Sequence, residues 1–588
     1  MSQNKLTLAH VTHEAVEQLG GIGTVLEGLI SSPIYQQRIG RTILIGPTQT
    51  HLHADPEKRL GEHGKVLYSS IDQIDHQNLG GRFRPIEWAF NTRVVYGTRT
   101  FTPPGQQRQG EAEVLLLDVF NTNHDRLSVF KLRMWETFGL DSSRYDKAWD
   151  YEEWVRLAEP AYYALQGLLR EEELPCIIFA HEFMGLPTAF QAILEGQEHF
   201  RTVFHGHECA TARRLVEDHP GHDTMFYNAL KIARQRGQYV NDVFGDQHHF
   251  FRHALVSRAH LCDGIIAVGD FTAMELQFLD PHFADRPVDV VYNGVPADPV
   301  TSQQKSESRG MLQDYATALL GHTPDVLMTH VTRPVISKGM WRDVKVCHRL
   351  DQLLGEQNRK GVLFILTTGG GVRRPQDVQN MERQYGWPRR HHVGYPDLVG
   401  PEVDLWRMIE PFNAEHDNVQ IILVNQFGCS PARIGNRLPK AMNIAHLRRA
   451  ADVEFGMATY EPFGISPLEP LGAGALCVIS NVCGCYGFAE AVAGGDPAPN
   501  VLCADFTKLD GNWDLQQLLA MDTHQRDRIE DRIAGPLAEE LFNRIPTTDA
   551  ERNAMIQSGQ KLAGGMGWDQ VIENRLLPML ERIVVPAV

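Results

Sequence analysis

The sequence lacks any run of about 18 consecutive apolar residues, the length that a membrane-spanning helix needs. Its first residues, MSQNKLTLAHVTHEAVEQLGG, contain neither the basic segment nor the long apolar segment of a secretory signal peptide. No internal repeat with a period of about 20 to 50 residues is present, and no long low-complexity run. We therefore expect a soluble cytoplasmic protein built from ordinary globular domains and not associated with a membrane.

Basic residues are too few for an extended polyanion to be the expected partner. The chain has 56 Lys and Arg against 73 Asp and Glu, a net charge of −17, which argues against nucleic-acid binding. A small phosphate compound can still bind through a local basic site. With 588 residues, of which 43% are hydrophobic, the chain is too long for one core and suits two large α/β domains with insertions.

Cysteine and histidine form no complete metal motif. The nine cysteines lie mostly in apolar, strand-like stretches such as PCIIFA, ALCVIS and VLCADF, as small core residues of a reducing compartment do. The CGC at 483–485 lacks a second pair at zinc spacing. HEFMG at His181 and HECAT at His207 open like HExxH but end in Gly185 and Thr211, so neither supplies a second ligand. We predict no metal site and no cofactor.

Short apolar runs alternate with segments of helical period through both halves of the chain. The first half has LTLAHVT, RTILIGP, EVLLLDV, CIIFAHE, RTVFHGH, GIIAVGD and VDVVYNG, and the second has VLMTHVT, VLFILTTGG, VQIILVNQF, VEFGMAT and LCVIS. Buried strands that alternate with helices are typical of parallel, doubly wound sheets. The fold class we predict is α/β, with two Rossmann-like domains.

The domain limits follow from the patterning. We predict an N-terminal domain over 1–295, a C-terminal domain over 323–560 and a closing helix over 561–588. Between the two domains, PADPVTSQQKSESRG is polar, carries two prolines and has no apolar periodicity, as a linker does. Residues 372–418 have the pattern of a loop-rich insertion with helical pieces. The closing helix has one apolar stripe, formed by Val571, Ile572, Leu576, Leu577 and Leu580.

The stretch YEPFGISPLEPLGAGA, residues 460–475, holds two glutamates eight positions apart. Ser466 suits the N-cap position, Pro467 suits the first helical position, and Glu469 suits the third. These residues predict a helix that begins at about Pro467 with a capping box between Ser466 and Glu469. Capping gives Glu469 an ordinary explanation. Glu461 has none, because it follows a predicted strand, where side chains of open α/β sheets face the ligand crevice.

The same turn has the features of an anion site. The amides of Gly464, Ile465 and Ser466 precede the predicted helix and would lie along its positive dipole, which suits a phosphate group. A carboxylate for hydroxyl groups beside an amide nest for phosphate indicates a sugar nucleotide.

Three further groups of residues leave alternatives open. Gly20 and Gly21, in LGGIGTV, permit close backbone approach to a phosphate or form a plain strand-to-helix turn. His207, in the HGH of RTVFHGH, either touches a bound sugar or is simply hydrogen-bonded. Arg333 and Lys338, in the loop after VLMTHVT, are either set against an anion or solvated surface charges.

The order of LGGIGTV, GHECATAR, VYNGV, RPVISKG and YEPFGISPLE resembles the glycogen and starch synthase families, retaining glycosyltransferases of the two-domain GT-B architecture. The resemblance covers most of the chain. Two segments are more similar to the animal and fungal type of glycogen synthase than to the bacterial type: VQIILVNQFGCS, before the glutamate stretch, and HHFFRHALVSRAHLCDGIIAVGDFTAMELQFL, before VYNGV. The resemblance implies a GT-B fold with a cleft between its domains.

The resemblance also implies roles for single residues. Glu461 would hold the transferred glucose, Glu469 the ribose, and Arg333 with Lys338 the diphosphate, whose growing charge they would neutralise. His207 would line the sugar pocket near the anomeric carbon. Gly464, Ile465 and Ser466 complete the expected donor site, and Gly20 and Gly21 would let the backbone of the first domain approach the donor. One departure is Gln18, which stands where the family usually has lysine.

We therefore expect a hexosyltransferase that moves glucose from UDP-glucose or ADP-glucose to the nonreducing end of an α-1,4-glucan. Arg333 and Lys338 take the place of a metal ion, so none is required. The alternatives are a small-sugar or lipid acceptor, or a non-catalytic glucan-binding scaffold with the same fold. A homo-oligomer is left open by the sequence.

Overall fold

The computed structural model describes residues 5–17, 20–48, 55–103, 108–196, 198–296, 298–495 and 498–584. The chain divides into two compact units. Unit 1 comprises Met1–Thr211, Arg234–Gly294 and Trp568–Val588, and unit 2 comprises Ala212–Ala233 and Val295–Gly567. Residues 212–233, which the predicted range 1–295 includes, thus group with unit 2.

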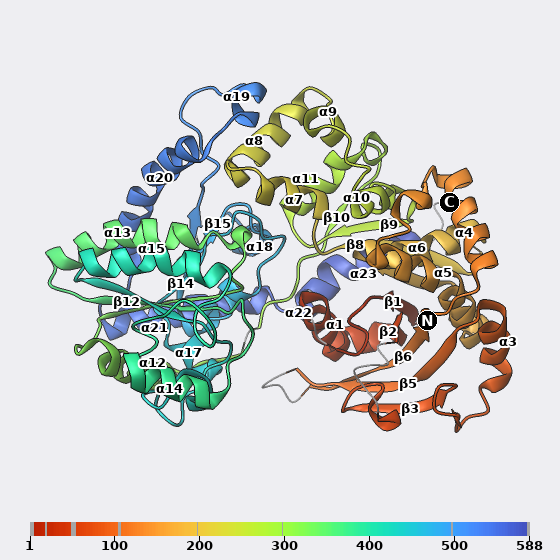
Figure 1. Ribbon diagram of the computed structural model, residues 1–588, viewed down its shortest axis with the longest axis horizontal. Helices are drawn as coiled ribbons and strands as arrows, with labels where there is room; N and C mark the ends of the chain where they lie inside the picture. The colour runs from red at the N-terminus through yellow and green to blue at the C-terminus, as the bar shows by residue number, and fades with distance from the viewer. Residues whose placement is uncertain are drawn as a thin grey trace. The chain divides into compact units, whose positions relative to one another are not determined.

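Unit 1 is built on a sheet with ten described strands, in the order β10-β9-β8-β7-β1-β2-β6-β5-β3-β4 (Figure 1). Neighbours from β10 to β6 are parallel, whereas β5, β3 and β4 add an antiparallel edge. The seven strands predicted for the first half all lie in the parallel part. The strands are β1 (Leu6–Val11), β2 (Ile39–Pro47), β3 (Gly64–Ser69), β4 (Ile74–Asp75), β5 (Arg93–Phe101), β6 (Gly110–Asp118), β7 (Cys176–His181), β8 (Phe200–Gly206), β9 (Gly264–Ala267) and β10 (Asp289–Val290).

Helices cover this sheet and connect its parallel strands. Helix α6 packs on β7 and β8, α5 packs on α6 and β2, and α1 packs on β6. The predicted C-terminal stripe is buried, from Val571 to Leu580. The helices of unit 1 are α1 (Gly21–Ser31), α2 (Pro33–Arg38), α3 (Gly80–Phe90), α4 (His124–Phe138), α5 (Trp149–Leu168), α6 (Glu182–Leu194), α9 (Val240–Phe244), α10 (Phe251–Val256), α11 (Asp270–Leu279), α22 (Trp568–Val571), a π-helical turn (Ile572–Leu576) and α23 (Leu577–Val584).

Unit 2 is built on a sheet with six described strands, all parallel, in the order β13-β12-β11-β14-β15-β16. The five strands predicted for the second half are all present. Residues predicted as an insertion supply the helices between β12 and β13. The strands are β11 (Val326–Val331), β12 (Gly361–Leu366), β13 (Val419–Val424), β14 (Val453–Gly456), β15 (Leu476–Ser480) and β16 (Val501–Ala504).

Two apolar clusters fill the two faces of the unit 2 sheet. Residues of α13, α15 and α20 pack on one face, and residues of α12, α14 and α17 on the other (Figure 1). The helices are α7 (Ala210–Asp218), α8 (His222–Gln235), α12 (Ser302–Leu320), α13 (Met340–Glu356), α14 (Pro375–Tyr385), α15 (Pro401–Glu415), α16 (Pro431–Ile434), α17 (Ile444–Ala450), α18 (Gly484–Ala493), α19 (Leu515–Leu519), α20 (Thr523–Arg544) and α21 (Asp549–Gly565).

A buried charge cluster attaches α8 to the rest of unit 2. The guanidinium of Arg342, on α13, donates to Asp223 at 2.6 Å and to Glu530 at 2.8 Å. All three side chains are fully buried. Because such charges are costly to bury unless they are paired, this cluster explains why residues 212–233 group with unit 2 and not with the first sheet.

The predicted linker is only partly a linker. Residues 302–320 form α12, which begins with a capping box between Thr301 and Gln304. The apolar residues that hold this helix, Leu312, Tyr315 and Leu319, are buried and lie beyond the polar stretch that we interpreted. The stretch after 301 is therefore helical, whereas the division between the units at Gly294 and Val295 coincides with the predicted end of the first domain.

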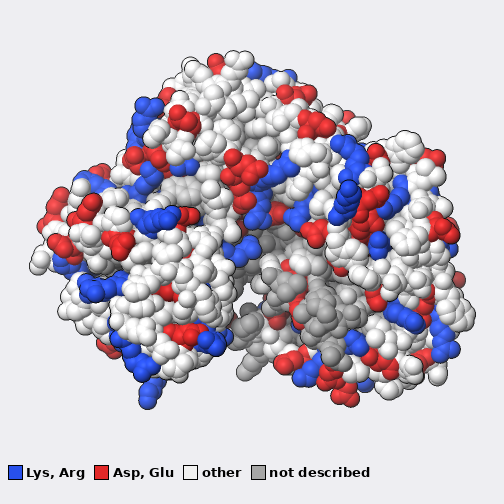
Figure 2. All heavy atoms as spheres, viewed as in Figure 1, with Lys and Arg blue, Asp and Glu red and all other residues white. Residues whose placement is uncertain are grey.

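Acidic and basic side chains are interspersed over the face in Figure 2. Among the described residues, no helix combines the length and the apolarity needed to cross a bilayer.

Candidate functional site

The loops that follow β11 and β14 lie side by side because these strands are parallel neighbours. The carbonyl of Ser337 accepts hydrogen bonds from the amides of Thr459 at 2.8 Å and Tyr460 at 3.2 Å. Gly339 has a φ of 59°, and a Cβ there would lie 2.5 Å from the carbonyl oxygen of Met457. Only glycine allows this approach.

This contact brings two predicted site residues together. Lys338, in a 3-10 turn over Ile336–Lys338, forms an ion pair with the carboxylate of Glu461, and both side chains are largely buried. Arg333 is exposed in the same loop, and no ion pair of its side chain is seen among the described residues. Unit 2 thus carries two cations and a carboxylate at the carboxyl edge of adjacent strands.

The turn around Glu461 differs from the prediction. No α-helix begins at Pro467; a single 3-10 turn spans Ser466–Leu468 and a second spans Leu471–Ala473. Pro470 lies between the two turns and has no amide to continue a helix. Ser466 is not an N-cap, since its hydroxyl donates to the carbonyl of Val331 at 2.7 Å. The predicted capping box is therefore wrong, and no helix dipole acts at this turn.

The amides of the turn nevertheless remain available. Those of Gly464, Ile465 and Ser466 have no acceptor among the described residues. Gly464 has a φ of 87°, followed by Ile465 in the right-handed helical region. Alternation of left-handed and right-handed residues turns successive amides to one side, which forms an anion nest.

Arg448 was missed by the sequence reasoning and organises this turn. Its guanidinium, at the end of α17, contacts Glu454 at 2.7 Å, the hydroxyl of Ser466 at 2.7 Å and Glu469 at 2.6 Å. The Arg448 side chain is nearly buried, whereas Glu469 is exposed. Glu469 therefore has an ion-pair partner in place of the predicted capping role.

Glu454, in the middle of β14, anchors the cluster. It is fully buried, and burial raises the pKa of its carboxyl group although Arg448 opposes that shift. It accepts hydrogen bonds from the hydroxyl of Thr329 and from the amide of Val331. A glutamate within the apolar run VEFGMAT was the sequence signal for this residue.

A second buried pair lies beside this cluster. His330, on β11, contacts Asp343 at 2.6 Å. Burial lowers the pKa of His330, but the Asp343 carboxylate outweighs burial, so the net shift is upward. The loop that carries Arg333 and Lys338 thus starts from a strand end held by charged contacts.

In unit 1, Gly20 and Gly21 stand at the start of α1. The carboxylate of Glu14 accepts a hydrogen bond from the amide of Gly23 at 2.7 Å, and a Cβ on Gly20 would lie 2.9 Å from Glu14. A Cβ on Gly21 would meet nothing within 4 Å. A buried carboxylate of the chain therefore already occupies part of this helix terminus. Gln18 lies outside the described residues.

His207 belongs to a histidine cluster in unit 1. Its Nε2 lies 2.8 Å from Nδ1 of His181, and its ring stacks on that of His205 with centroids 4.1 Å apart. Burial, reinforced by neighbouring histidines, holds the pKa of His181 and His207 well below the ordinary value. The ring is hydrogen-bonded, as one predicted alternative has it, and it is only half-buried. The other alternative, contact with a bound sugar, therefore stays open.

Glu182, also missed, follows His181 with a φ of 56°. A non-glycine residue in this region stores backbone strain, which often marks a functional site. Its buried carboxylate accepts a hydrogen bond from the amide of Glu208 at 2.6 Å, and burial raises its pKa well above the ordinary value.

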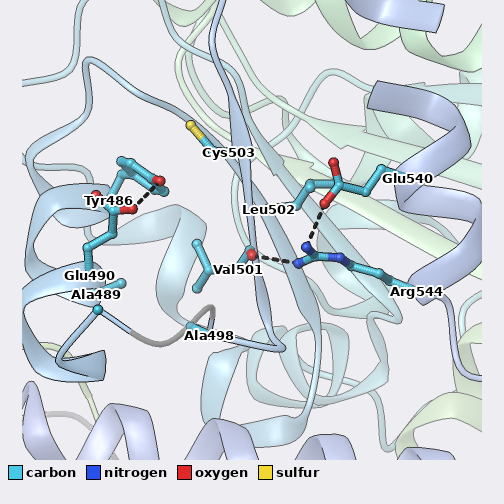
Figure 3. Close-up of a pocket in the computed structure, with 10 residues that line it drawn as sticks. Tyr486, Ala489, Glu490, Ala498, Val501, Leu502, Cys503, Glu540 and Arg544 are labelled. Carbon is cyan, nitrogen blue, oxygen red and sulfur yellow. Dashed lines mark hydrogen bonds and ion pairs between the residues drawn. The ribbon is translucent and has the colours of Figure 1, made fainter. Parts of the chain in front are cut away.

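A pocket of about 230 Å³ lies elsewhere in unit 2, between α18, β16 and α20. Figure 3 shows Arg544 turned toward Glu540 and the carbonyl of Val501, and Tyr486 toward Glu490. Arg544 and Glu540 are thus paired with each other, and Glu490 accepts a hydrogen bond from the hydroxyl of Tyr486. None of the predicted site residues lines this pocket.

No protein-family model and no curated protein matches the sequence. The fold, however, is similar to solved glycosyltransferase structures. The catalytic domain of starch synthase IV from Arabidopsis thaliana, bound to ADP and acarbose, matches with a TM-score of 0.53, 15% identity and 99% coverage of both chains. A UDP-forming α,α-trehalose-phosphate synthase from Burkholderia xenovorans matches with a TM-score of 0.50, 13% identity and coverage of 99% and 100%.

At these identities the likeness shows the fold alone. The chain has two α/β domains with parallel sheets, the fold of GT-B glycosyltransferases. The predicted fold class is therefore confirmed.

Proposed function

We propose that the protein is a retaining hexosyltransferase that moves glucose from UDP-glucose or ADP-glucose to the nonreducing end of an α-1,4-glucan. The observation that carries this proposal is the contact in unit 2 between Lys338 and Glu461. It places a cation suited to a diphosphate against a carboxylate suited to sugar hydroxyls.

The chemistry follows from the charges that change during transfer. When the bond between glucose and the nucleotide breaks, the sugar becomes oxocarbenium-like and the diphosphate gains negative charge. Lys338 and Arg333 stabilise that charge, while the amides of Gly464, Ile465 and Ser466 bind phosphate oxygens. Glu461 holds the glucose hydroxyls and Glu469 the ribose. No metal ion is needed for this step.

The ion pair of Lys338 with Glu461 keeps both groups in place before the donor arrives. On binding, the ammonium passes from the carboxylate to the diphosphate, and the carboxylate turns to the sugar hydroxyls. Because this exchange replaces one charged contact with two, it favours the intact nucleotide sugar over the free sugar.

In unit 1, we assign His207 to the sugar pocket, near the anomeric carbon, and the backbone at Gly20 and Gly21 to the donor. These roles, like the likeness to the animal and fungal synthases, rest on the sequence resemblance. A hexose-phosphate acceptor is the second candidate, since the trehalose-phosphate synthase matches about as well as the starch synthase.

The test is nucleotide release by the purified protein. Each donor, UDP-glucose and ADP-glucose, is combined with glycogen, maltooligosaccharide or glucose 6-phosphate. We expect one donor to release its nucleotide only with a glucan; release only with glucose 6-phosphate supports the second candidate. Silence with every pair, together with no calorimetric binding of UDP or ADP, would leave only a non-catalytic scaffold.

A further inference from the structure

Four histidines of unit 1 lie on one face of the sheet. His181 pairs in register with His205 across β7 and β8, and His207, just past the end of β8, is two residues beyond His205. His10 pairs in register with Phe179, two residues before His181. Since side chains alternate across a strand, all four rings project from the same side.

Three of these rings lie close enough to share one ion. His181, His205 and His207 each offer a ring nitrogen, and these atoms lie within 4.8 Å of one another. Around a tetrahedral zinc ion, nitrogen ligands at about 2.0–2.1 Å stand roughly 3.3 Å apart. The two most distant ring nitrogens therefore have to approach each other by about 1.5 Å, which small side-chain rotations achieve.

His205 has no partner in the present arrangement. Its ring is 4% exposed, and neither nitrogen has a hydrogen-bond partner among the described residues. Leaving a buried polar group unsatisfied costs about 1–3 kcal/mol. A chain of hydrogen bonds through His10, His181 and His207 does not remove this cost, because it bypasses His205.

We propose that His181, His205 and His207 bind a divalent transition-metal ion of the zinc type. Each truncated HExxH motif of the sequence supplies one ligand, and the third comes from the neighbouring strand position. Imidazole ligands without a carboxylate select zinc-like ions over magnesium or calcium. The HExxH pattern does not reveal this site, because that pattern has two ligands on one helix whereas these three lie at the ends of two strands.

The surroundings match what a metal-bound histidine requires. Nε2 of His181 lies 2.9 Å from Nδ1 of His10, and Nε2 of His10 lies 3.4 Å from the hydroxyl of Tyr35. With the ion on Nδ1 of His181, its Nε2–H donates to His10, which donates to Tyr35. Such outer contacts orient metal ligands.

The site opens at one ligand only. His181 and His205 are buried, whereas His207 is half-buried, so the ion and its fourth ligand, a water molecule, are reached from the His207 side. If the proposed glucosyl transfer also holds, the ion occupies a nitrogen of His207 that we assign to the sugar. Zinc then inhibits transfer, and a chelator restores it.

The experiment is a metal titration without substrate, so failure of the proposed transfer leaves it unaffected. Full-length protein stripped with a chelator is titrated with Co²⁺, whose visible absorption reports tetrahedral coordination, and Zn²⁺ is then added as competitor. We expect one equivalent of Co²⁺ to bind with tetrahedral bands that Zn²⁺ abolishes, and no response to Mg²⁺. Absence of stoichiometric tetrahedral binding overturns the proposal.

Variants assign the ligands. His205→Ala lowers affinity by at least about 100-fold, and His10→Phe, which removes an outer contact, by about 10-fold to 100-fold. The matched control is His253→Ala, since His253 is a buried histidine of unit 1 that contacts Thr211 outside the cluster. Unchanged affinity in a folded His205→Ala overturns the proposal. If that variant does not fold, the wild-type stoichiometry and His10→Phe decide.

Discussion

The two units place different chemistry at the carboxyl ends of their parallel strands. Unit 2 gathers full charges that are held by opposite charges, as in the contacts of Lys338 with Glu461 and of Arg448 with Glu454 and Glu469. Unit 1 gathers imidazoles that burial keeps neutral, among them His10 and His205. Paired charges tolerate burial because each compensates the other, whereas a histidine tolerates it by losing its proton.

This difference suits different partners. Under the proposed function, the cation and the carboxylate of unit 2 exchange their mutual contact for a diphosphate and a sugar. Neutral imidazoles instead offer lone pairs, to a metal ion or to uncharged hydroxyl groups. If the contrast is real, removing one charge from unit 2 has to cost far more than removing one imidazole from unit 1.

The largest effect is expected from Arg448→Met. It leaves Glu454 buried without its cation, and breaking a buried ion pair in this way costs about 3–5 kcal/mol. The measurement is thermal unfolding by calorimetry, with each transition followed separately because two-state behaviour is not assumed for two domains. Arg449→Met is the control, since Arg449 is half-buried on the same helix and donates to the carbonyl of Ala445, so its loss leaves no buried carboxylate unpaired and should cost at most about 1.5 kcal/mol. Equal losses of unfolding free energy in the two variants would contradict the anchoring role of Arg448.

The second prediction distinguishes the role of Glu461 from that of Lys338, and it rests on the proposed function. Glu461→Ala should lower turnover by about 10²-fold to 10³-fold, the size seen when one group that stabilises the transition state is removed. Its affinity for UDP or ADP should change by less than about 1 kcal/mol, because the nucleotide contacts remain. Lys338→Ala should weaken both quantities, since the ammonium meets the diphosphate. Steady-state kinetics and calorimetry give the two values, and a reversed pattern would show that the roles are misassigned.

The contrast extends to pH. His10 and His205 have a pKa of about 3 when folded, against 6.5 when unfolded. The unfolded chain therefore binds more protons between these values, and stability falls as pH drops below 6.5, by about 2 kcal/mol per histidine at pH 5. His330 behaves oppositely: its pKa is raised because Asp343 outweighs burial, so its contribution is present below 6.5 and lost as pH rises through the raised value.

Unfolding of His205→Asn and His330→Asn across pH tests this. The first variant should flatten the acid limb of the stability profile by up to about 1.4 kcal/mol per pH unit, one proton. The second should flatten only the neutral-to-alkaline limb. Identical changes in both variants would remove the distinction between the units.

Local patterns predicted the parallel core of both sheets, since buried strands such as β7 and β12 are continuous apolar runs. They missed the antiparallel edge of unit 1. Strand β5, RVVYGTRTF, mixes arginines and a glycine with its apolar residues, and its place depends on pairing with β6. The place of such a strand is decided by its neighbours, here β6 and β3, more than by its own sequence.

The site shows the same limit. Lys338 and Glu461 were assigned to one donor site, and the adjacency of β11 and β14 brings them together. The cluster of Arg448 with Glu454 was not foreseen, because the contacts that complete it, from Glu454 to Thr329 and Val331, depend on strand order. The capping box failed for a related reason: Ser466 has Arg448 and the Val331 carbonyl as partners, and these outcompete a local backbone contact.

The smallest effect is expected from a change in the turn at Gly464, which tests whether the conformation of this turn positions Glu461. Gly464→Ala places a Cβ 2.8 Å from Cγ of Glu461, at a φ of 87°, which costs about 1–3 kcal/mol in strain. Gly472→Ala is the control, since its nearest contact is an ordinary 3.6 Å. Because the strain falls on Glu461, turnover should drop by about 10-fold for Gly464→Ala and stay near wild type for Gly472→Ala. Equal activity in both variants would mean that the position of Glu461 does not depend on the nest, and that its ion pair with Lys338 alone holds it in place.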